Sequence, residues 1–216
     1  MRPAASGSNA TNAQLELPMA LFGVVALVFV WSGINPYDRL TWVLEVLPVL
    51  IAMPLLAYTA RRFPLTPLVY VLIAVHAVIL MYGGHYTYAL TPFGDWMRDA
   101  FGFTRNHYDR IGHLMQGFGP AMVARELLLR TSPLRPGKWL FTLVTLSILG
   151  VSAIYEFTEW WAALAGGDSA GAFLGTQGDV WDTQWDMFLC ACGAIAAQLL
   201  LARMHDRQLR AKGVAV

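Results

Sequence analysis

The sequence predicts an all-α, multi-pass membrane protein: a six-helix transmembrane bundle with both termini in the cytoplasm. The chain has 216 residues, of which 56% are hydrophobic and 13% are charged, whereas a soluble domain carries about 25% charged residues. Its apolar residues gather in runs of roughly 20 residues, the length that a helix needs to cross a bilayer. A backbone in lipid must satisfy its own hydrogen bonds, so we expect these runs to be helices.

Five segments are apolar enough to be spans by hydropathy: residues 17–34, 41–60, 64–86, 138–164 and 181–204. A further segment, residues 106–129, is polar in its first half and apolar in its second. We expect it to be a helix inside the bundle, with its polar groups on one side. Residues 1–15 are small and polar, so we expect a disordered tail there and a single membrane domain over residues 16–205. Residues 206–216 are expected to form a basic cytoplasmic tail.

The loops between the spans indicate the orientation, because Lys and Arg concentrate on the cytoplasmic side. With six spans, the loops after the second and fourth spans and the end of the chain share one side. These places contain Arg61, Arg62, Arg130, Arg135, Lys138, Arg203, Arg207, Arg210 and Lys212. A five-span chain would place one of these groups on the opposite side, which independently supports residues 106–129 as a span. The net charge of +1 gives no basic field that would indicate a nucleic-acid partner.

The acidic residues and three of the five histidines concentrate on the outer side. Eleven of the 14 acidic residues fall there, against four of the 15 basic residues. The candidate site residues lie near the outer ends of the last four spans: His85, Arg105, His107, Asp109, Arg110, His113, Glu156, Glu159, Asp179, Asp182 and Asp186. Within each of the last three spans the acidic or imidazole groups are three or four residues apart, so they share one helix face. Glu45, near the outer end of the second span, is expected to join them.

Ionisable residues so close to apolar spans are by default a functional-site hypothesis, because a charge in lipid is costly. The few outer arginines neutralise only part of the negative charge, which favours a cation, a proton-sharing network or a water-filled cavity. In helix bundles, inward-facing carboxylates and imidazoles bind metal ions. The expected ligands of a divalent metal are Asp109, His113, Glu156, Asp179, Asp182 and Asp186. Zn, Mn or Fe suits such a set with imidazole, and Ca or Mg suits oxygen ligands alone.

The leading hypothesis is a metal-dependent hydrolase or transferase that acts at the outer leaflet on a lipid or a small anionic substrate. The cation would activate water or polarise a phosphoryl or acyl oxygen. The expected catalytic residues are His85, His107, Arg105, Arg110 and Glu159, with a carboxylate or imidazole as general base and an arginine for an anionic head group. Two other classes stay open: a small ion or solute transporter, and a non-catalytic membrane scaffold. The sequence sets no oligomeric state.

Several of these residues also have a purely structural interpretation. His76, on an apolar span, is more often a packing residue than a ligand. Asp179 suits the N-cap of the last span, and Asp109 suits the first turn of its span. Arg125 is expected to extend to the cytoplasmic head groups. The Gly-rich segment 165–179 is either a lid over the polar cavity or a flexible connector.

Four unusual runs carry a resemblance to a known family: GGHYTYA (83–89), RNHYDRIGHLMQGFGPA (105–121), SAIYEFTEWWAAL (152–164) and FLGTQGDVWDTQWDM (173–187). They resemble the YjdF-type family of bacterial inner-membrane proteins, and the resemblance extends over about residues 17–204. It implies a multi-spanning protein of the bacterial inner (cytoplasmic) membrane, with the lipid bilayer as its partner. It implies no activity, cofactor or catalytic residue, so the candidate residues rest on their chemistry alone.

Overall fold

The computed structural model describes residues 6–166 and 176–216 and, within these ranges, contains helices and no strand. The seven helices are α1 (Ser6–Gly33), α2 (Arg39–Thr59), α3 (Pro67–Tyr86), α4 (Pro92–Phe101), α5 (Tyr108–Thr131), α6 (Lys138–Gly166) and α8 (Asp182–Ala211). The all-α prediction is therefore confirmed for this part of the chain. Most of the candidate lid, residues 165–179, lies outside the described residues.

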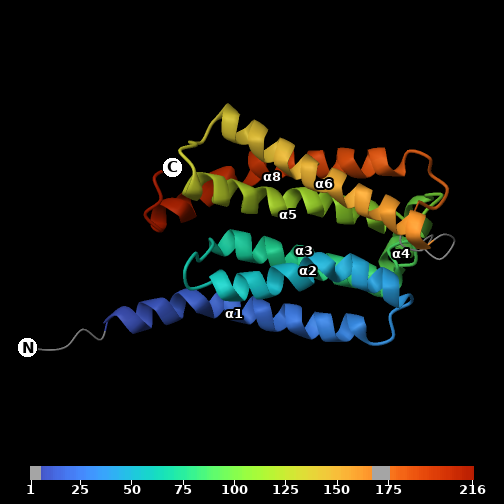
Figure 1. The fold of residues 1–216 in the computed structure, drawn as a ribbon, viewed down its shortest axis with the longest axis horizontal. Helices are drawn as coiled ribbons and strands as arrows, with labels where there is room; N and C mark the ends of the chain where they lie inside the picture. The colour runs from blue at the N-terminus through green and yellow to red at the C-terminus, as the bar shows by residue number, and fades with distance from the viewer. Residues whose placement is uncertain (1–5, 167–175) are drawn as a thin grey trace, which may run out of the picture.

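The long helices run along a common axis and form two layers (Figure 1). One layer contains α1, α2 and α3, and the other contains α5, α6 and α8. The layers are joined mainly where α3 packs against α5. The start of α1 and the end of α8 lie at the same end of the bundle, and α4 lies at the opposite end.

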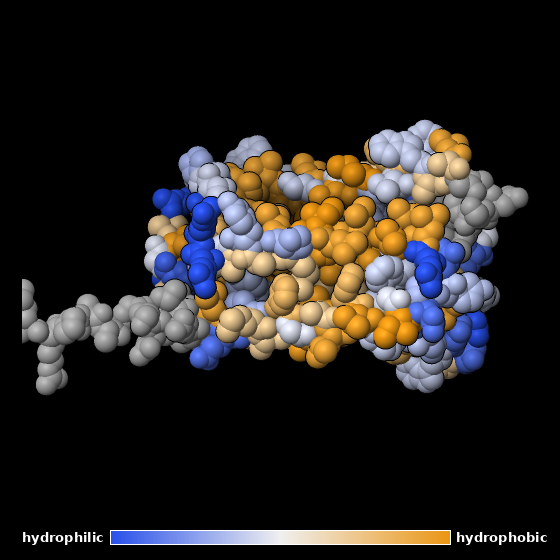
Figure 2. Space-filling view, turned by 60° about the horizontal axis from the view of Figure 1, so that its bottom comes forward, coloured by the Kyte–Doolittle hydropathy of each residue, from blue (hydrophilic) through white to orange (hydrophobic). Residues whose placement is uncertain are grey.

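Five helices are long and apolar enough to cross a membrane: α1 from Leu15, α2, α3, α6 to Ala165, and α8. Figure 2 shows the result on one face, where a hydrophobic belt separates hydrophilic residues at the two ends. The helix α5 is not among the five, because its first half is polar, but it packs against α3, α6 and α8 as expected for an inner helix. The helices α1 and α8 extend into the segments expected to be tails, since α1 begins at Ser6 and α8 ends at Ala211.

The short helix α4 was not predicted from the sequence. Ten residues are too few to register as a span, although both ends carry local signals. Pro92 occupies the first turn, where its missing N–H costs nothing, and Gly102 follows the last turn with a φ of 69°, the left-handed conformation that glycine adopts readily. The helix lies at the end of the bundle from which α5 begins (Figure 1).

Two glycines allow α5 and α8 to form the closest helix pair of the described chain. A Cβ atom on Gly117 would overlap the carbonyl oxygen of Cys190 in α8, and a Cβ atom on Gly193 would overlap the carbonyl oxygen of Leu114 in α5. The two backbones are thus in direct contact, as small residues permit between membrane helices. This contact brings the polar face of α5 against α8.

The start of α5 is held by the buried side chain of Asn106, which is 1% exposed. Its Oδ1 accepts a hydrogen bond from the backbone N–H of Tyr108 at 3.1 Å, and its Nδ2 donates to the carbonyl of Thr91 at 3.0 Å. The Gln177 side chain also bonds to the Asn106 backbone N–H and C=O, at 3.0 and 2.8 Å. Asn106 therefore links α4, α5 and the segment before α8.

We expect the substitution Asn106→Ala to lower the free energy of unfolding by about 2 kcal/mol, because it leaves buried backbone groups without a partner. Thermal unfolding of the purified protein in detergent measures this loss. The matched control is Gln184→Ala on exposed Gln184, which should change stability by less than about 0.5 kcal/mol. Equal melting temperatures for both variants would show that Asn106 does not hold this end together.

Candidate metal site

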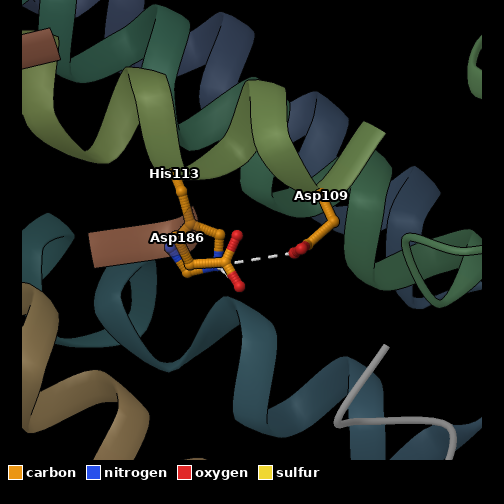
Figure 3. Close-up of side chains that lie close together, drawn as sticks. All are labelled: Asp109, His113 and Asp186. Carbon is orange, nitrogen blue, oxygen red and sulfur yellow. Dashed lines mark ion pairs between the residues drawn. The ribbon is translucent and has the colours of Figure 1, made fainter. Parts of the chain in front are cut away.

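Carboxylates from three helices surround one imidazole at the α4 end of the bundle. His113 and Asp109 project from one side of α5 toward Asp186 of α8 (Figure 3). His113 Nε2 lies 3.4 Å from Asp109 Oδ1 and 3.9 Å from Asp186 Oδ2. On its other side, His113 Nδ1 lies 4.0 Å from Glu156 Oε1 in α6. The spacing of four residues in α5 places Asp109 and His113 on the same face, as predicted.

Two groups of three side chains in this cluster are close enough to share one ion. Asp109, His113 and Asp186 form the first group, and His113, Glu156 and Glu159 form the second. Within each group the ligand atoms lie within 4.8 Å of one another. His113 belongs to both groups, so the two sets surround a single centre rather than two separate ones.

The side chains at this centre are shielded from the surface, and some of their oxygens lack a partner. His113 and Glu156 are each 6% exposed, and Asp186 is 2% exposed. Among the described residues, Glu156 Oε1 and Asp186 Oδ1 have no hydrogen-bond partner. Buried carboxylate oxygens are normally hydrogen-bonded or bind a cation, because desolvating them alone is costly. The cluster thus has free ligand capacity.

Asp179 and Asp182, both expected as metal ligands, pair with arginines. Arg105 Nη1 lies 2.7 Å from Asp182 Oδ1 and 3.3 Å from Asp179 Oδ2, and Arg110 Nη2 lies 2.7 Å from Asp179 Oδ2. Neither aspartate belongs to the two possible ion-binding groups. Arg105 and Arg110, expected as catalytic residues, therefore neutralise the carboxylates beside the centre rather than those within it.

Glu45 joins the cluster from the other layer. It is 6% exposed, and its Oε2 accepts a hydrogen bond from the Tyr155 hydroxyl at 2.8 Å. Tyr155 and Gln116, whose Oε1 lies 3.1 Å from His113 Nδ1, were not singled out in the sequence. Only their positions one helical turn from other site residues would have indicated them.

Two expected catalytic histidines lie outside this cluster. His85 lies between α3 and α1, where its Nδ1 is 2.9 Å from the carbonyl oxygen of Ser32 and its ring centroid is 4.6 Å from that of Trp31. His107 precedes α5 and packs edge-on against Phe103, with ring centroids 4.8 Å apart. Burial and the nearby guanidinium groups of Arg110 and Arg105 lower the pKa of His107, so it is neutral at neutral pH and adds no positive charge beside the carboxylates.

A cavity of about 790 Å³ lies beside the cluster, between the two layers. Side chains from α1, α2, α3, α5 and α6 line it. At one end its wall contains Glu45, Asp109, His113, Tyr155 and Glu159, and along the rest it is almost entirely apolar. The cluster therefore faces a mostly hydrophobic space.

A second polar cluster, which the sequence did not reveal, lies at the opposite end of the bundle. Glu126 and His205 are both 0% exposed. His205 Nε2 is 3.0 Å from Glu126 Oε2, Arg130 donates to Glu126 Oε1 at 2.7 Å, and Thr66 donates to Glu126 through its backbone and hydroxyl. Every polar atom of Glu126 is thus satisfied, which is the pattern of a structural network.

Arg125 belongs to the same network, so its expected extension to the head groups is wrong. It is 4% exposed, and its guanidinium contacts His205 Nδ1 at 2.8 Å and Asp206 at 2.7 Å. Because α5 and α8 are in close contact, the guanidinium reaches acceptors on α8 before it reaches the bundle surface.

Comparison with known proteins identifies the kind of protein. The family model described as "Predicted membrane protein (DUF2238)" matches residues 17–207. The chain is also 52% identical over 190 residues to the inner membrane protein YjdF of Escherichia coli (strain K12). The matched residues cover 88% of this chain and 91% of that protein. No solved structure matches. The resemblance carried by the four sequence runs is thereby confirmed.

Proposed function

This chain belongs to the DUF2238 family of predicted membrane proteins and is an inner-membrane protein, and we propose that it is a metal-dependent hydrolase or transferase. We further propose that α5 is a sixth span and that both termini are cytoplasmic, because the basic loops then share one side. This arrangement places the carboxylate cluster in the outer half of the membrane. The bound cation is the central element of the proposal.

The observation that carries the proposal is an excess of buried carboxylates around one imidazole. Asp109, Glu156, Glu159 and Asp186 surround His113, and no Arg or Lys of the described chain forms an ion pair with any of these four. Several buried negative charges without a counter-charge are strongly unfavourable. A divalent cation would neutralise them and use the oxygens that have no other partner.

The orientation of His113 supports the same conclusion. When Nδ1 donates its proton to Gln116 Oε1, 3.1 Å away, the lone pair of Nε2 points toward the oxygens of Asp109 and Asp186. A lone pair facing two carboxylates is unfavourable, and a proton on Nε2 or a cation between these groups relieves it. A hydrogen bond that fixes the tautomer of a ligating histidine is common at metal sites. Asp109, His113 and Asp186 are therefore the proposed primary ligands.

The remaining groups suit hydrolysis or group transfer. The cation would polarise a phosphoryl or acyl oxygen and lower the pKa of a bound water. Glu156 or Glu159, on the opposite side of His113, would accept the proton of the attacking water or alcohol. Arg110, whose side chain is 23% exposed beside Asp179, supplies positive potential for an anionic head group.

The lining of the cavity supports an enzyme over a transporter. A transporter would need a polar path that continues beyond the middle of the membrane. Apart from the cluster and its neighbours His76 and Gln116, few polar side chains line the cavity, and one of these is Arg61 at the far end. A scaffold, in turn, would have no need of unpartnered buried carboxylate oxygens.

Metal analysis of the purified protein tests the proposal. We expect wild type, expressed with Zn, Mn and Fe in the medium, to retain a transition metal near stoichiometry. His113→Ala and Asp186→Asn should reduce this content by about tenfold or more, since each removes a proposed ligand. Addition of the identified metal to stripped wild type should raise its melting temperature, because a ligand that binds only the folded state stabilises it.

The matched control is Asp99→Asn, which neutralises a carboxylate of α4 whose side chain is 72% exposed. It should retain the wild-type metal content. Folded wild type that neither contains metal nor gains stability from added Zn, Mn, Fe, Ca or Mg would refute the proposal. Unchanged metal content in both ligand variants would refute the assignment of the ligands.

A further inference from the structure

We infer that the cavity beside the candidate metal site binds the hydrocarbon chain of a membrane phospholipid, whose phosphoryl or acyl group then reaches the cluster. As a statement about substrate class, this rests on the metal-dependent activity proposed above. Three features of the cavity carry it: a polar end, a long apolar wall with space left by small residues of α2 and α5, and an opening toward the surrounding membrane.

The cavity is amphiphilic along its length. Glu45, Asp109 and Glu159 line the end at the cluster. The walls beyond this end consist mainly of aliphatic and aromatic side chains such as Phe22 of α1 and Leu80 of α3. A molecule that fits this lining has a polar head and an apolar tail. Its head lies at the proposed cation, and its tail lies between the two layers.

Small residues on the facing helices create the space. Ala52 and Ala57 of α2 and Gly119 and Ala124 of α5 line the cavity. Along α5 the lining extends from Asp109 to Leu127, a length of about 27 Å at the rise of an α-helix. The hydrocarbon core of a bilayer is about 30 Å thick. The cavity is thus long enough for an extended hydrocarbon chain, and its volume of about 790 Å³ lies in the range of ligand sites.

Several residues of the cavity lining are exposed at the sides of the bundle, so the cavity opens sideways. Among the described helices, α2 packs extensively only against α3, and it reaches α6 through the Glu45–Tyr155 hydrogen bond. The lining residues Leu55 of α2 and Val151 of α6 are 57% and 49% exposed. Both belong to helices long and apolar enough to cross a membrane, so the opening faces lipid.

The position of the opening identifies the occupant. An apolar cavity without an occupant loses dispersion contacts along its walls, and the molecules available at a lateral opening within the bilayer are phospholipids. A phospholipid also carries the phosphoryl and acyl oxygens that a cation polarises. A water-soluble substrate would gain nothing from a long apolar wall.

Photo-crosslinking tests the inference. The full chain is placed in nanodiscs of phosphatidylethanolamine and phosphatidylglycerol that contain a phosphatidylethanolamine with a diazirine on one acyl chain, and lipid adducts are mapped by peptide mass spectrometry. We expect adducts at the cavity-lining Val123. Ala52→Trp, which fills the cavity, should reduce them by about fivefold or more, as should Ala57→Trp nearer the far end, by steric exclusion of the chain.

Two controls accompany these variants. Ala20→Trp adds the same bulk at an exposed position of α1 that does not line the cavity, and it should leave the Val123 adducts unchanged. Adducts at Leu199 and Leu200 of α8, each 71% exposed, should form equally in every variant and report the general exposure to lipid.

The outcomes separate the lipid inference from the metal proposal. Adducts at Leu199 with none at Val123, or Val123 adducts that persist in both Trp variants, would overturn the lipid inference. A stable dimer of this chain that protects Val123 in place of lipid would also overturn it. Asp186→Asn should lose metal and keep the Val123 adducts, whereas Ala52→Trp should keep metal and lose the adducts, so either idea can fail without the other.

Discussion

The substitution Gly193→Ala is expected to lower the free energy of unfolding by about 3 kcal/mol, at the upper end of the cost of overpacking. The added methyl group would overlap the carbonyl oxygen of Leu114 and approach the backbone nitrogen of Phe118. Backbone atoms cannot rotate away as a side chain can, so α5 and α8 must move apart. Gly117→Ala should act similarly, because its methyl group would overlap the carbonyl oxygen of Cys190.

Thermal unfolding in detergent measures both effects against the control Gly150→Ala. A Cβ atom on Gly150, in α6, would meet no other atom within 4 Å. Alanine there should be neutral or stabilise the helix by up to about 1 kcal/mol. The double variant should cost less than the sum of the two single variants, because either substitution alone already forces α5 and α8 apart at the same contact. Wild-type stability of Gly193→Ala would show that the backbones of α5 and α8 are further apart than described.

The second large effect is expected for Glu126→Gln, at the end of the bundle opposite the candidate metal site. The change preserves the shape of the side chain and removes the charge that pairs with Arg130 and accepts from Thr66 and His205. Removing one partner of a buried ion pair costs about 3–5 kcal/mol. The loss should appear as a lower melting temperature with unchanged metal content.

Glu16→Gln is the matched control, since Glu16 is exposed on α1. It makes the same chemical change and should alter stability by less than about 0.5 kcal/mol. If Glu126→Gln instead removed the metal and left stability intact, the network around Glu126 would have to be part of the functional site. That result would contradict its structural role.

Hydropathy and helical spacing predicted most of the fold because both properties are local. The apolar runs have the length that the bilayer requires, so the spans follow from the sequence alone. The spacing of Asp109 and His113 on one face of α5 also follows from local geometry. The short helix α4 does not, because its ten residues are too few to cross a bilayer and show no such apolar run.

Contacts between helices depend on how each helix is rotated about its axis and on how deep it lies in the bundle. Local sequence patterns specify neither. Asp182 and Asp186 share one face of α8 one turn apart, yet the first meets Arg105 and the second lies beside His113. His85 lies in the last turn of α3, on the side that faces α1, where its Nδ1 contacts the carbonyl oxygen of Ser32. Each of these outcomes follows from how deeply a helix sits and which neighbour it faces.

The same limit explains why the pairing of Glu126 with His205 was not foreseen. The two residues lie on different helices, and nothing in their local sequence marks them as partners. Their contact requires the close approach of α5 and α8, which depends on Gly117 and Gly193. A polar residue within a span was recognisable; its partner was not.

The glycine contact between α5 and α8 has a consequence for the ion selectivity of the proposed metal site. Gly117 and Cys190 each lie one helical turn beyond His113 and Asp186, so the main chain itself sets the separation of these two ligands. Glu156 and Glu159 belong to α6, in which no described glycine is in such close contact with a neighbouring helix. In the proposed metal site, Asp109, His113 and Asp186 would therefore be held at fixed positions, and adjustment to a larger or smaller ion would fall to the two glutamates.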